Sequence, residues 1–183
     1  MRRGTLRRAC AALALAASPA LGHADTLRLY SYDPADQATR EASGGLTFEV
    51  KKGLMHSTVL SLMATDAKAS APLRKVGEAA LPGPLSQAMG PRPGERDVYE
   101  VRPTDEGPAL IAALCPGSKR AWLAFGRVRF DQDLKVEVLG DRTGGGLRLC
   151  RALAFSFHGE WMAPPSGPVM RERNLPHGRY PGT

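Results

Sequence analysis

Apolar and polar residues alternate in several short segments of this chain. In the segment 46–51, Leu46, Phe48 and Val50 alternate with polar residues, and a period of two is typical of a strand with one buried face. Aspartates and glutamine at 131–133 and three glycines at 144–146 indicate turns. The pattern predicts strands over 27–32, 46–51, 56–65, 98–101, 122–130, 134–138 and 147–157.

Two helices are predicted from their end signals. Residues 33–43 begin with a capping aspartate followed by proline, and a glycine follows the last residue. Residues 104–114 begin with threonine and two acids, which favour the positive end of a helix dipole. This second helix places Leu110, Ile111 and Leu114 on one face, so it is expected to be the more buried of the two.

The last predicted strand has one bulky and one small face. Its odd positions carry mostly Leu and Phe, whereas its even positions carry Cys150, alanines and a serine. A helix comes close to a strand only over small side chains, so the second helix is expected on the small face. The predicted fold is α+β: a mixed or antiparallel sheet of six or seven strands with one main helix packed on one face, plus a short N-terminal helix.

Proline-rich stretches delimit the folded part of the chain. Residues 67–96 contain five prolines and are predicted to be mostly loop, with one short helical turn over 85–89. Residues 162–183 also contain five prolines and have little apolar periodicity, so a disordered tail is expected there. A single α+β domain is therefore predicted over 25–161.

The first 24 residues have the pattern of a cleaved secretory signal. Four arginines precede an apolar run over 9–21, and small residues precede a cleavage site between Ala24 and Asp25. The alternative is a membrane anchor, but this run is shorter than the roughly 20 residues that a transmembrane helix needs. No later segment is long and apolar enough to cross a membrane. We therefore expect a periplasmic or secreted bacterial protein.

Signal removal also changes the charge of the protein. The whole chain carries 25 basic and 18 acidic residues, a formal charge of +7, and four of the basic residues belong to the signal. Three arginines and one glutamate lie in the segment 171–183, which leaves the body of the protein close to neutral. Nucleic-acid binding is not expected, because it requires a basic stripe on the folded domain.

Two cysteines, Cys115 and Cys150, remain after signal removal. An even number of cysteines in an oxidising compartment predicts one disulfide. Closing a loop of about 36 residues would stabilise the fold by ~4 kcal/mol through the entropy of the unfolded chain. Two buried thiols and a two-cysteine metal site are the alternatives, although no C-x-x-C pair supports the metal site.

Candidate catalytic or metal-binding residues are few. His158 and Glu160 form an H-x-E pair at the end of the last strand, where residues i and i+2 share a face. His56 opens another predicted strand, so a site of two histidines and one glutamate forms if the two strand ends meet. The alternative is that all three side chains are simply solvated at strand ends.

Four arginines on the last three predicted strands suggest a basic patch. Arg127 and Arg129 precede the turn at 131–133, and Arg148 and Arg151 lie on the last strand. Such a patch suits an anionic component of the cell envelope. The alternative is that these arginines form salt bridges with acids of the same hairpin.

The sequence contains no catalytic motif and no phosphate-binding loop. We therefore expect an exported, non-catalytic binding or structural module of the cell envelope, with no cofactor. The alternative is a small metal-dependent or hydrolytic enzyme that uses His56, His158 and Glu160.

Overall fold

The computed structural model describes residues 26–53, 56–90 and 96–163. The predicted signal, its cleavage site and residues 164–183 lie outside this part. The helices are α1 (Gln37–Ser43), α2 (Leu85–Met89) and α3 (Gly107–Leu114), with a 3-10 turn at Glu78–Ala80. The strands are β1 (Thr26–Pro34), β2 (Leu46–Lys52), β3 (Ser57–Ala64), β4 (Ala69–Val76), β5 (Asp97–Val101), β6 (Ala121–Phe125), β7 (Leu134–Asp141) and β8 (Leu147–Met162).

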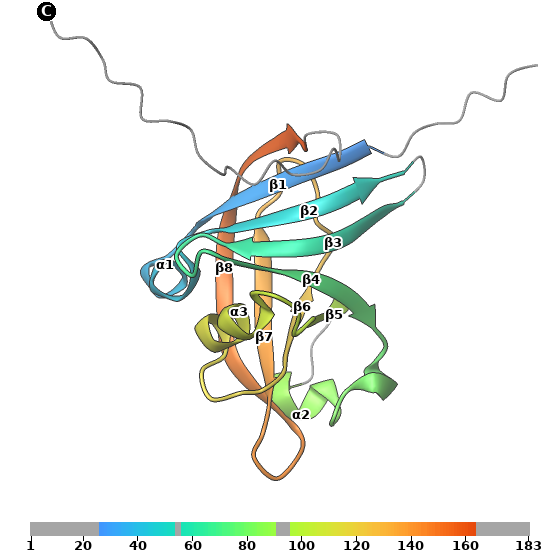
Figure 1. Cartoon of the computed structure of the whole chain (residues 1–183), viewed down its shortest axis with the longest axis vertical. Coiled ribbons are helices and arrows are strands. Elements are labelled where there is room, and N and C mark those ends of the chain that lie inside the picture. Colours follow the sequence, from blue (N-terminus) through green and yellow to red (C-terminus); the bar gives the residue numbers. More distant parts are fainter. Residues whose placement is uncertain (1–25, 54–55, 91–95, 164–183) are drawn as a thin grey trace, which may run out of the picture.

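The eight strands form a closed antiparallel barrel (Figure 1). Each strand pairs with the next along the chain, and β8 also pairs with β1, where Tyr32 lies opposite Phe157. Closure gives every strand two neighbours and removes the exposed edges of an open sheet. The predicted α+β sheet with one main helix on its face is therefore wrong. Alternation locates strands along a chain, but it carries no information about which strands pair.

Inward-facing side chains fill the middle of the barrel. Phe48, Leu62, Leu123 and Val136 come from four different strands and are almost completely buried in one core cluster. An eight-stranded barrel encloses an interior that side chains can fill, or that can hold one small ligand. In this protein side chains occupy the centre.

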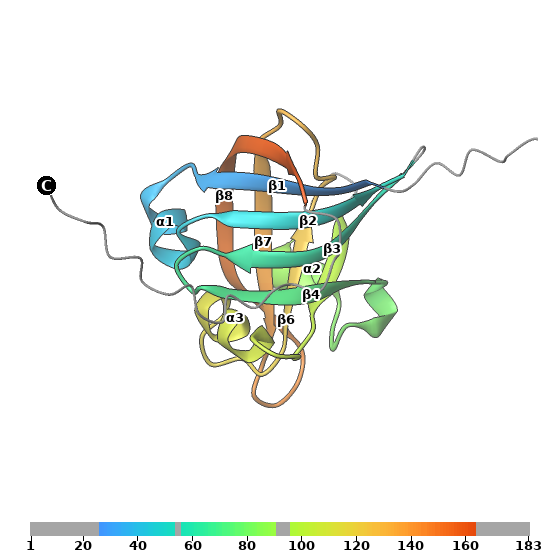
Figure 2. The same cartoon turned by 45° about the horizontal axis from the view of Figure 1, so that its top comes forward.

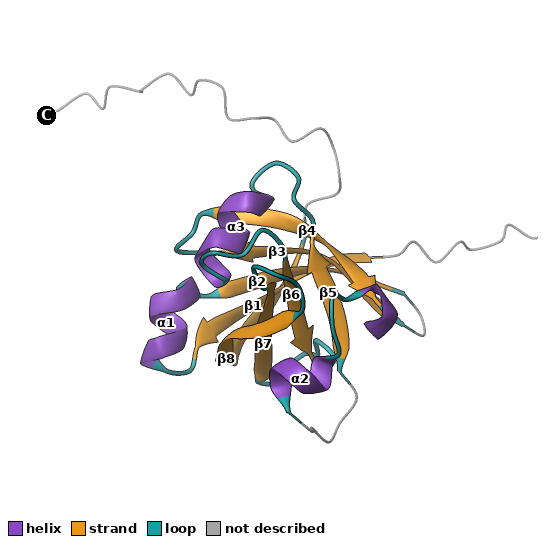
Figure 3. Ribbon diagram, turned by 90° about the horizontal axis from the view of Figure 1, so that it is seen from below, coloured by secondary structure: helices purple, strands orange, loops and turns teal. Residues whose placement is uncertain are grey.

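Two helices cover one end of the barrel. Figures 2 and 3 show α1 and α3 near one another at this end. The predicted apolar face of α3, namely Leu110, Ile111 and Leu114, is buried in the barrel core. The helix packs mainly against β4 and α1, so the expectation that it lies on the small face of the last strand is wrong.

The short helix α1 begins three residues later than predicted. Asp33 and Pro34 continue β1, and Asp36 is the N-cap, because its carboxylate accepts a hydrogen bond of 2.7 Å from the Thr39 backbone N–H. Gly44 ends the helix as predicted. It adopts a left-handed conformation with φ of 64°, which glycine accommodates without steric strain.

The segment 67–96, expected to be mostly loop, contains strand β4. Pro72 pairs with Ser61 of β3, and the pairing of β4 with β5 starts only at Leu73, opposite Val101, the last residue of β5. The missing N–H of Pro72 therefore falls at an end of the β4–β5 ladder, where proline is tolerated. The Pro72 carbonyl accepts a hydrogen bond of 3.0 Å from the Arg102 backbone N–H. The helical turn expected at 85–89 is confirmed as α2.

A second apolar cluster lies outside the barrel. Trp122, Leu139 and Leu147 face outward from β6, β7 and β8 and pack with Leu85 and Met89 of α2. This contact holds α2 against the outer wall. Here Glu137 of β7 is buried and forms an ion pair with Arg96.

Strand β8 contains two bulges, which overturn its predicted faces. The first leaves Cys150 unpaired, because Val138 lies opposite Arg151 and Leu139 lies opposite Leu149. The second leaves His158 unpaired. Each extra residue shifts the alternation, so Phe155 faces the core, whereas Leu147 belongs to the outer cluster.

Within the described ranges, no helix combines the length and apolar character needed to cross a membrane.

Candidate ligand-binding mouth

The end of the barrel opposite α1 and α3 opens into a cavity of about 1230 Å³, which we call the mouth cavity. Antiparallel order brings the β2–β3 hairpin, the end of β4, the start of β5 and the β6–β7 loop to this end. These segments supply its lining: Val50, Lys52, Gly53, His56, Ser57, Val59, Lys75, Arg96, Asp97, Tyr99, Gly126, Arg127, Val128, Arg129, Gln132, Asp133, Leu134 and Lys135.

Buried side chains form the inner surface of the mouth cavity. Val50, Val59, Tyr99 and Leu134 line it and also belong to the barrel core. The Tyr99 ring stacks on Phe125, with ring centroids 4.8 Å apart and planes 8° apart. The inner surface is therefore fixed by core packing.

Basic side chains dominate the charge of the mouth cavity. Six lysines and arginines line it, against Asp97 and Asp133. Three of the cations have acidic partners. Lys75 pairs with Asp97 at 2.6 Å, Lys52 lies 4.0 Å from Glu160, and Arg96 pairs with Glu137.

Arg127 and Arg129 are the cations of the mouth cavity that matter most for binding. Both are exposed on the β6–β7 loop, and neither forms an ion pair with another described residue. Asp133, in the same loop, accepts a hydrogen bond of 3.2 Å from the Phe157 backbone N–H. The two guanidinium groups are thus available to an anion, which arginine binds in a bidentate manner.

Tyr99 contributes a protonated hydroxyl at the inner surface. Burial and the neighbouring Asp97 carboxylate raise the pKa of Tyr99 to about 12. The phenol therefore stays neutral at physiological pH and is held by its hydrogen bond to Asp97. Lys75, Asp97 and Tyr99 form a connected polar group on one wall of the cavity.

A second polar group lies near the mouth on β1 and β8. Glu160 lies opposite Tyr30 and 3.5 Å from Arg28. Burial, together with the Glu160 carboxylate, raises the pKa of Tyr30. Glu160 is therefore engaged by Tyr30, Arg28 and Lys52.

The structure separates the three residues of the predicted metal site. Phe157 and Glu160 contact the inward-facing Tyr30, whereas His158, at the bulge, contacts the exposed Asp33 at 2.7 Å and stacks on Trp161. The bulge breaks the i, i+2 relation that placed both side chains on one face. His56 is exposed and lines the mouth cavity. Within the described residues, no cluster of three His, Cys, Asp or Glu side chains could hold a metal ion.

The predicted basic patch is divided between the two ends of the barrel. Arg127 and Arg129 line the mouth cavity, whereas Arg148 and Arg151 lie beside the end of α3. Arg148 donates a hydrogen bond of 2.6 Å to the Pro116 carbonyl, and Arg151 donates one of 3.2 Å to the Leu114 carbonyl. Arg151 thus binds a carbonyl group at the C-terminus of α3, and Arg148 binds one in the turn that follows the helix.

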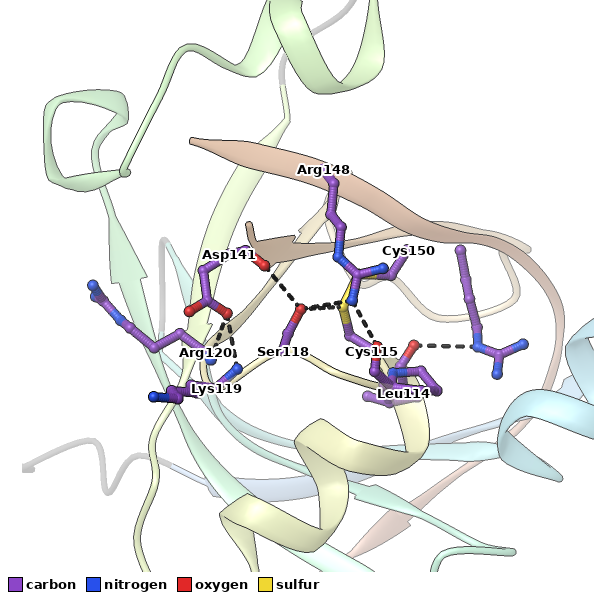
Figure 4. Close-up of a disulfide and its surroundings, with 10 residues drawn as sticks. Leu114, Cys115, Ser118, Lys119, Arg120, Asp141, Arg148 and Cys150 are labelled. Carbon is purple, nitrogen blue, oxygen red and sulfur yellow. Dashed lines mark hydrogen bonds between the residues drawn. A yellow bond between two sulfur atoms is a disulfide. The ribbon is translucent and has the colours of Figure 1, made fainter. Parts of the chain in front are cut away.

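The predicted disulfide between Cys115 and Cys150 is present, with its Cα atoms 5.3 Å apart (Figure 4). It joins the end of α3 to the first bulge of β8. Ser118 lies beside it and accepts a hydrogen bond of 2.9 Å from Arg148. The bond therefore secures the closed end of the barrel, far along the strands from the mouth.

Sequence reasoning singled out Arg127, Arg129 and His56 but missed the other basic residues of the mouth. Lys52 ends β2, Lys75 lies near the end of β4, and Arg96 immediately precedes β5. Basic residues near alternate strand ends were a usable signal. Only the up-and-down order of the barrel shows that these ends meet.

Comparison with models of protein families, with characterised proteins and with solved structures finds no match to this chain.

Proposed function

We propose that this protein binds a small, hydrophilic anion in the mouth cavity and acts as a non-catalytic binding module of the cell envelope. The observation that carries the proposal is the pair of arginines, Arg127 and Arg129, exposed to the cavity without an acidic partner among the described residues. Their charge favours phosphate or carboxylate groups.

The filled core supports a hydrophilic ligand over a fatty-acyl chain. Phe48, Leu62 and Val136 occupy the barrel centre and are essentially inaccessible to solvent. A long apolar chain needs a deep apolar channel, and these side chains occupy that space. The mouth cavity instead offers cations, the Tyr99 hydroxyl and Gln132, which suit a phosphorylated or carboxylated sugar.

A location in the envelope is part of this proposal. The disulfide supports it, because such bonds persist in oxidising compartments. The pattern at residues 1–24 supports it as well.

The test uses two sugars that differ only in a phosphate group. Protein expressed from the full sequence is recovered from the envelope fraction, where its N-terminal residue should be Asp25, and titrated calorimetrically with glucose 6-phosphate and glucose at low ionic strength. We expect binding of the phosphate ester alone. The double variant Arg127→Gln, Arg129→Gln should weaken it about tenfold or more, because each charged hydrogen bond contributes about 1.5–3 kcal/mol.

Arg40→Gln, Lys119→Gln is the matched control, because it removes the same charge from exposed positions in α1 and after α3. It should leave binding unchanged. An equal loss of affinity in both double variants would show that binding depends on net charge and not on these two arginines. The absence of glucose 6-phosphate binding would reject a phosphorylated sugar as ligand. An uncleaved N-terminus would contradict the envelope location.

A further inference from the structure

Three of the large apolar side chains exposed on the described residues lie on segments at the mouth. Phe130 is 63% exposed on the β6–β7 loop, and Trp161 and Met162, at 46% and 70%, end β8. Figures 1 and 2 show this loop and the end of β8 at the same end of the barrel. We call these three residues the apolar rim.

Each aromatic ring of the apolar rim packs against one neighbouring ring and is otherwise exposed to solvent. The Phe130 ring meets the Phe157 ring edge-on, with centroids 5.3 Å apart. The Trp161 ring stacks on His158, with centroids 5.6 Å apart. These contacts orient both rings but leave about half of each to solvent. Clustered exposed apolar side chains of this kind mark interaction surfaces.

Cations accompany the apolar rim. Arg127 and Arg129 precede Phe130 in the same loop, and Lys52, Lys75 and Lys135 lie around the cavity that the loop borders. Asp131 and Asp133 balance the two arginines within the loop, so the net positive charge around the cavity comes from the lysines. Aromatic and methionine side chains beside arginine and lysine suit a bilayer surface, where the rings enter the headgroup region and each basic residue gains about 1 kcal/mol from anionic lipid.

We propose that the apolar rim docks this protein on the surface of a bilayer that contains anionic lipid, with the mouth cavity facing the headgroups. Charge complementarity favours this occupant over a second copy of the chain. Two copies meeting mouth to mouth would bring the same cations together, and like charges across an interface oppose association. The inference shares its cations with the proposed ligand site, but Phe130, Trp161 and Met162 lie outside the cavity lining, so docking can be tested separately from ligand binding.

The chain offers an internal fluorescent reporter of docking. It contains two tryptophans, Trp122, which is fully buried, and Trp161, which is half exposed. A blue shift of the emission on adding vesicles therefore reports burial of Trp161. We expect this shift with mixed phosphatidylcholine–phosphatidylglycerol vesicles at low salt, a weaker shift at high salt, and little with phosphatidylcholine alone. The Trp161→Phe variant should show no shift, because it lacks the reporter, yet it should still sediment with the mixed vesicles.

The decisive comparison is co-sedimentation of two double variants. Phe130→Ala, Trp161→Ala should lower partitioning onto the mixed vesicles about tenfold or more, because it removes most of the aromatic area that enters the bilayer. Met63→Ala, Leu149→Ala is the matched control, because both residues are exposed apolar side chains away from the mouth. It should partition like the parent protein. Thermal unfolding confirms that both variants are folded.

The proposal is overturned if the parent protein does not sediment with the mixed vesicles, or if both double variants lose binding equally. It is also overturned if light scattering shows a dimer that requires Phe130 and Trp161. Glucose 6-phosphate binding should persist in Phe130→Ala, Trp161→Ala, so failure of docking and failure of the proposed ligand are separate results.

Discussion

At the scale of single residues, glycines and bulged residues determine how the closed end of the barrel fits together. Gly140 of β7 lies directly beneath the disulfide and Ser118. A Cβ atom at this position would overlap both sulfur atoms and the serine hydroxyl. The absence of a side chain on Gly140 is therefore what allows Cys115 and Cys150 to meet over β7.

Gly140→Ala should destabilise the protein by about 1–3 kcal/mol, the usual effect of overpacking a well-packed site. The measurement is urea unfolding of the oxidised protein. Gly77→Ala is the control, since a Cβ there meets no atom within 4 Å and its φ of −82° suits alanine. If both variants unfold at the same urea concentration as the parent protein, the disulfide does not lie over Gly140.

At the scale of elements, one charged cluster ties three neighbouring strands together. Glu100 of β5 accepts hydrogen bonds from Arg74 of β4 and from Arg120, which immediately precedes β6, the latter at 2.6 Å. Arg120 also lies over the Trp122 ring, 4.7 Å from its centroid. Burial opposes ionisation of Glu100, but the hydrogen bonds and charges of both arginines outweigh it, so the pKa of Glu100 is lowered.

Glu100→Gln should therefore reduce stability by about 1–2 kcal/mol near neutral pH. A carboxylate whose pKa is lowered by folding stabilises the folded state above its ordinary pKa of 4.5, and this contribution disappears as pH falls through the lowered value. The stability difference between parent and variant should thus shrink below pH 4.5. Thermal unfolding over this range measures it, with exposed Glu41→Gln as control. A stability difference between parent and variant that does not change with pH would contradict the role of ionised Glu100 in this cluster.

At the scale of the whole molecule, closure gives the barrel two unlike ends. The β1–β8 ladder joins the first and last described strands, where Asp33 and His158 are separated by 125 positions in sequence. One end carries α1, α3 and the disulfide, and the other is open and cationic.

Closure predicts that β1 and β8 are as protected as the strands between them. Native-state hydrogen exchange should show amides of β1 exchanging only near the free energy of global unfolding, as those of β6 do, because neither strand is an edge. Exchange of the whole of β1 through a much lower-energy opening would indicate an open sheet.

The sequence by itself determined the local features of this protein. Alternation located the strands except β4, although it extended one strand to residue 130, where β6 ends at Phe125. Glycine ended α1, and the two cysteines were paired correctly. These features depend on neighbouring residues or on a simple count. Two of the residues that bind at the mouth in our proposal, Arg127 and Arg129, were also singled out.

Only the tertiary structure decided the barrel, the bulges and the mouth cavity. Barrel closure depends on pairing between the two ends of the chain, which local pattern does not encode. A bulge adds one residue to one strand, so it is visible only against the partner strand, and it separated His158 from Glu160. Lys52, Lys75 and Arg129 line the same cavity because antiparallel order brings alternate strand ends together. Their proximity follows from the fold and not from their spacing in the sequence.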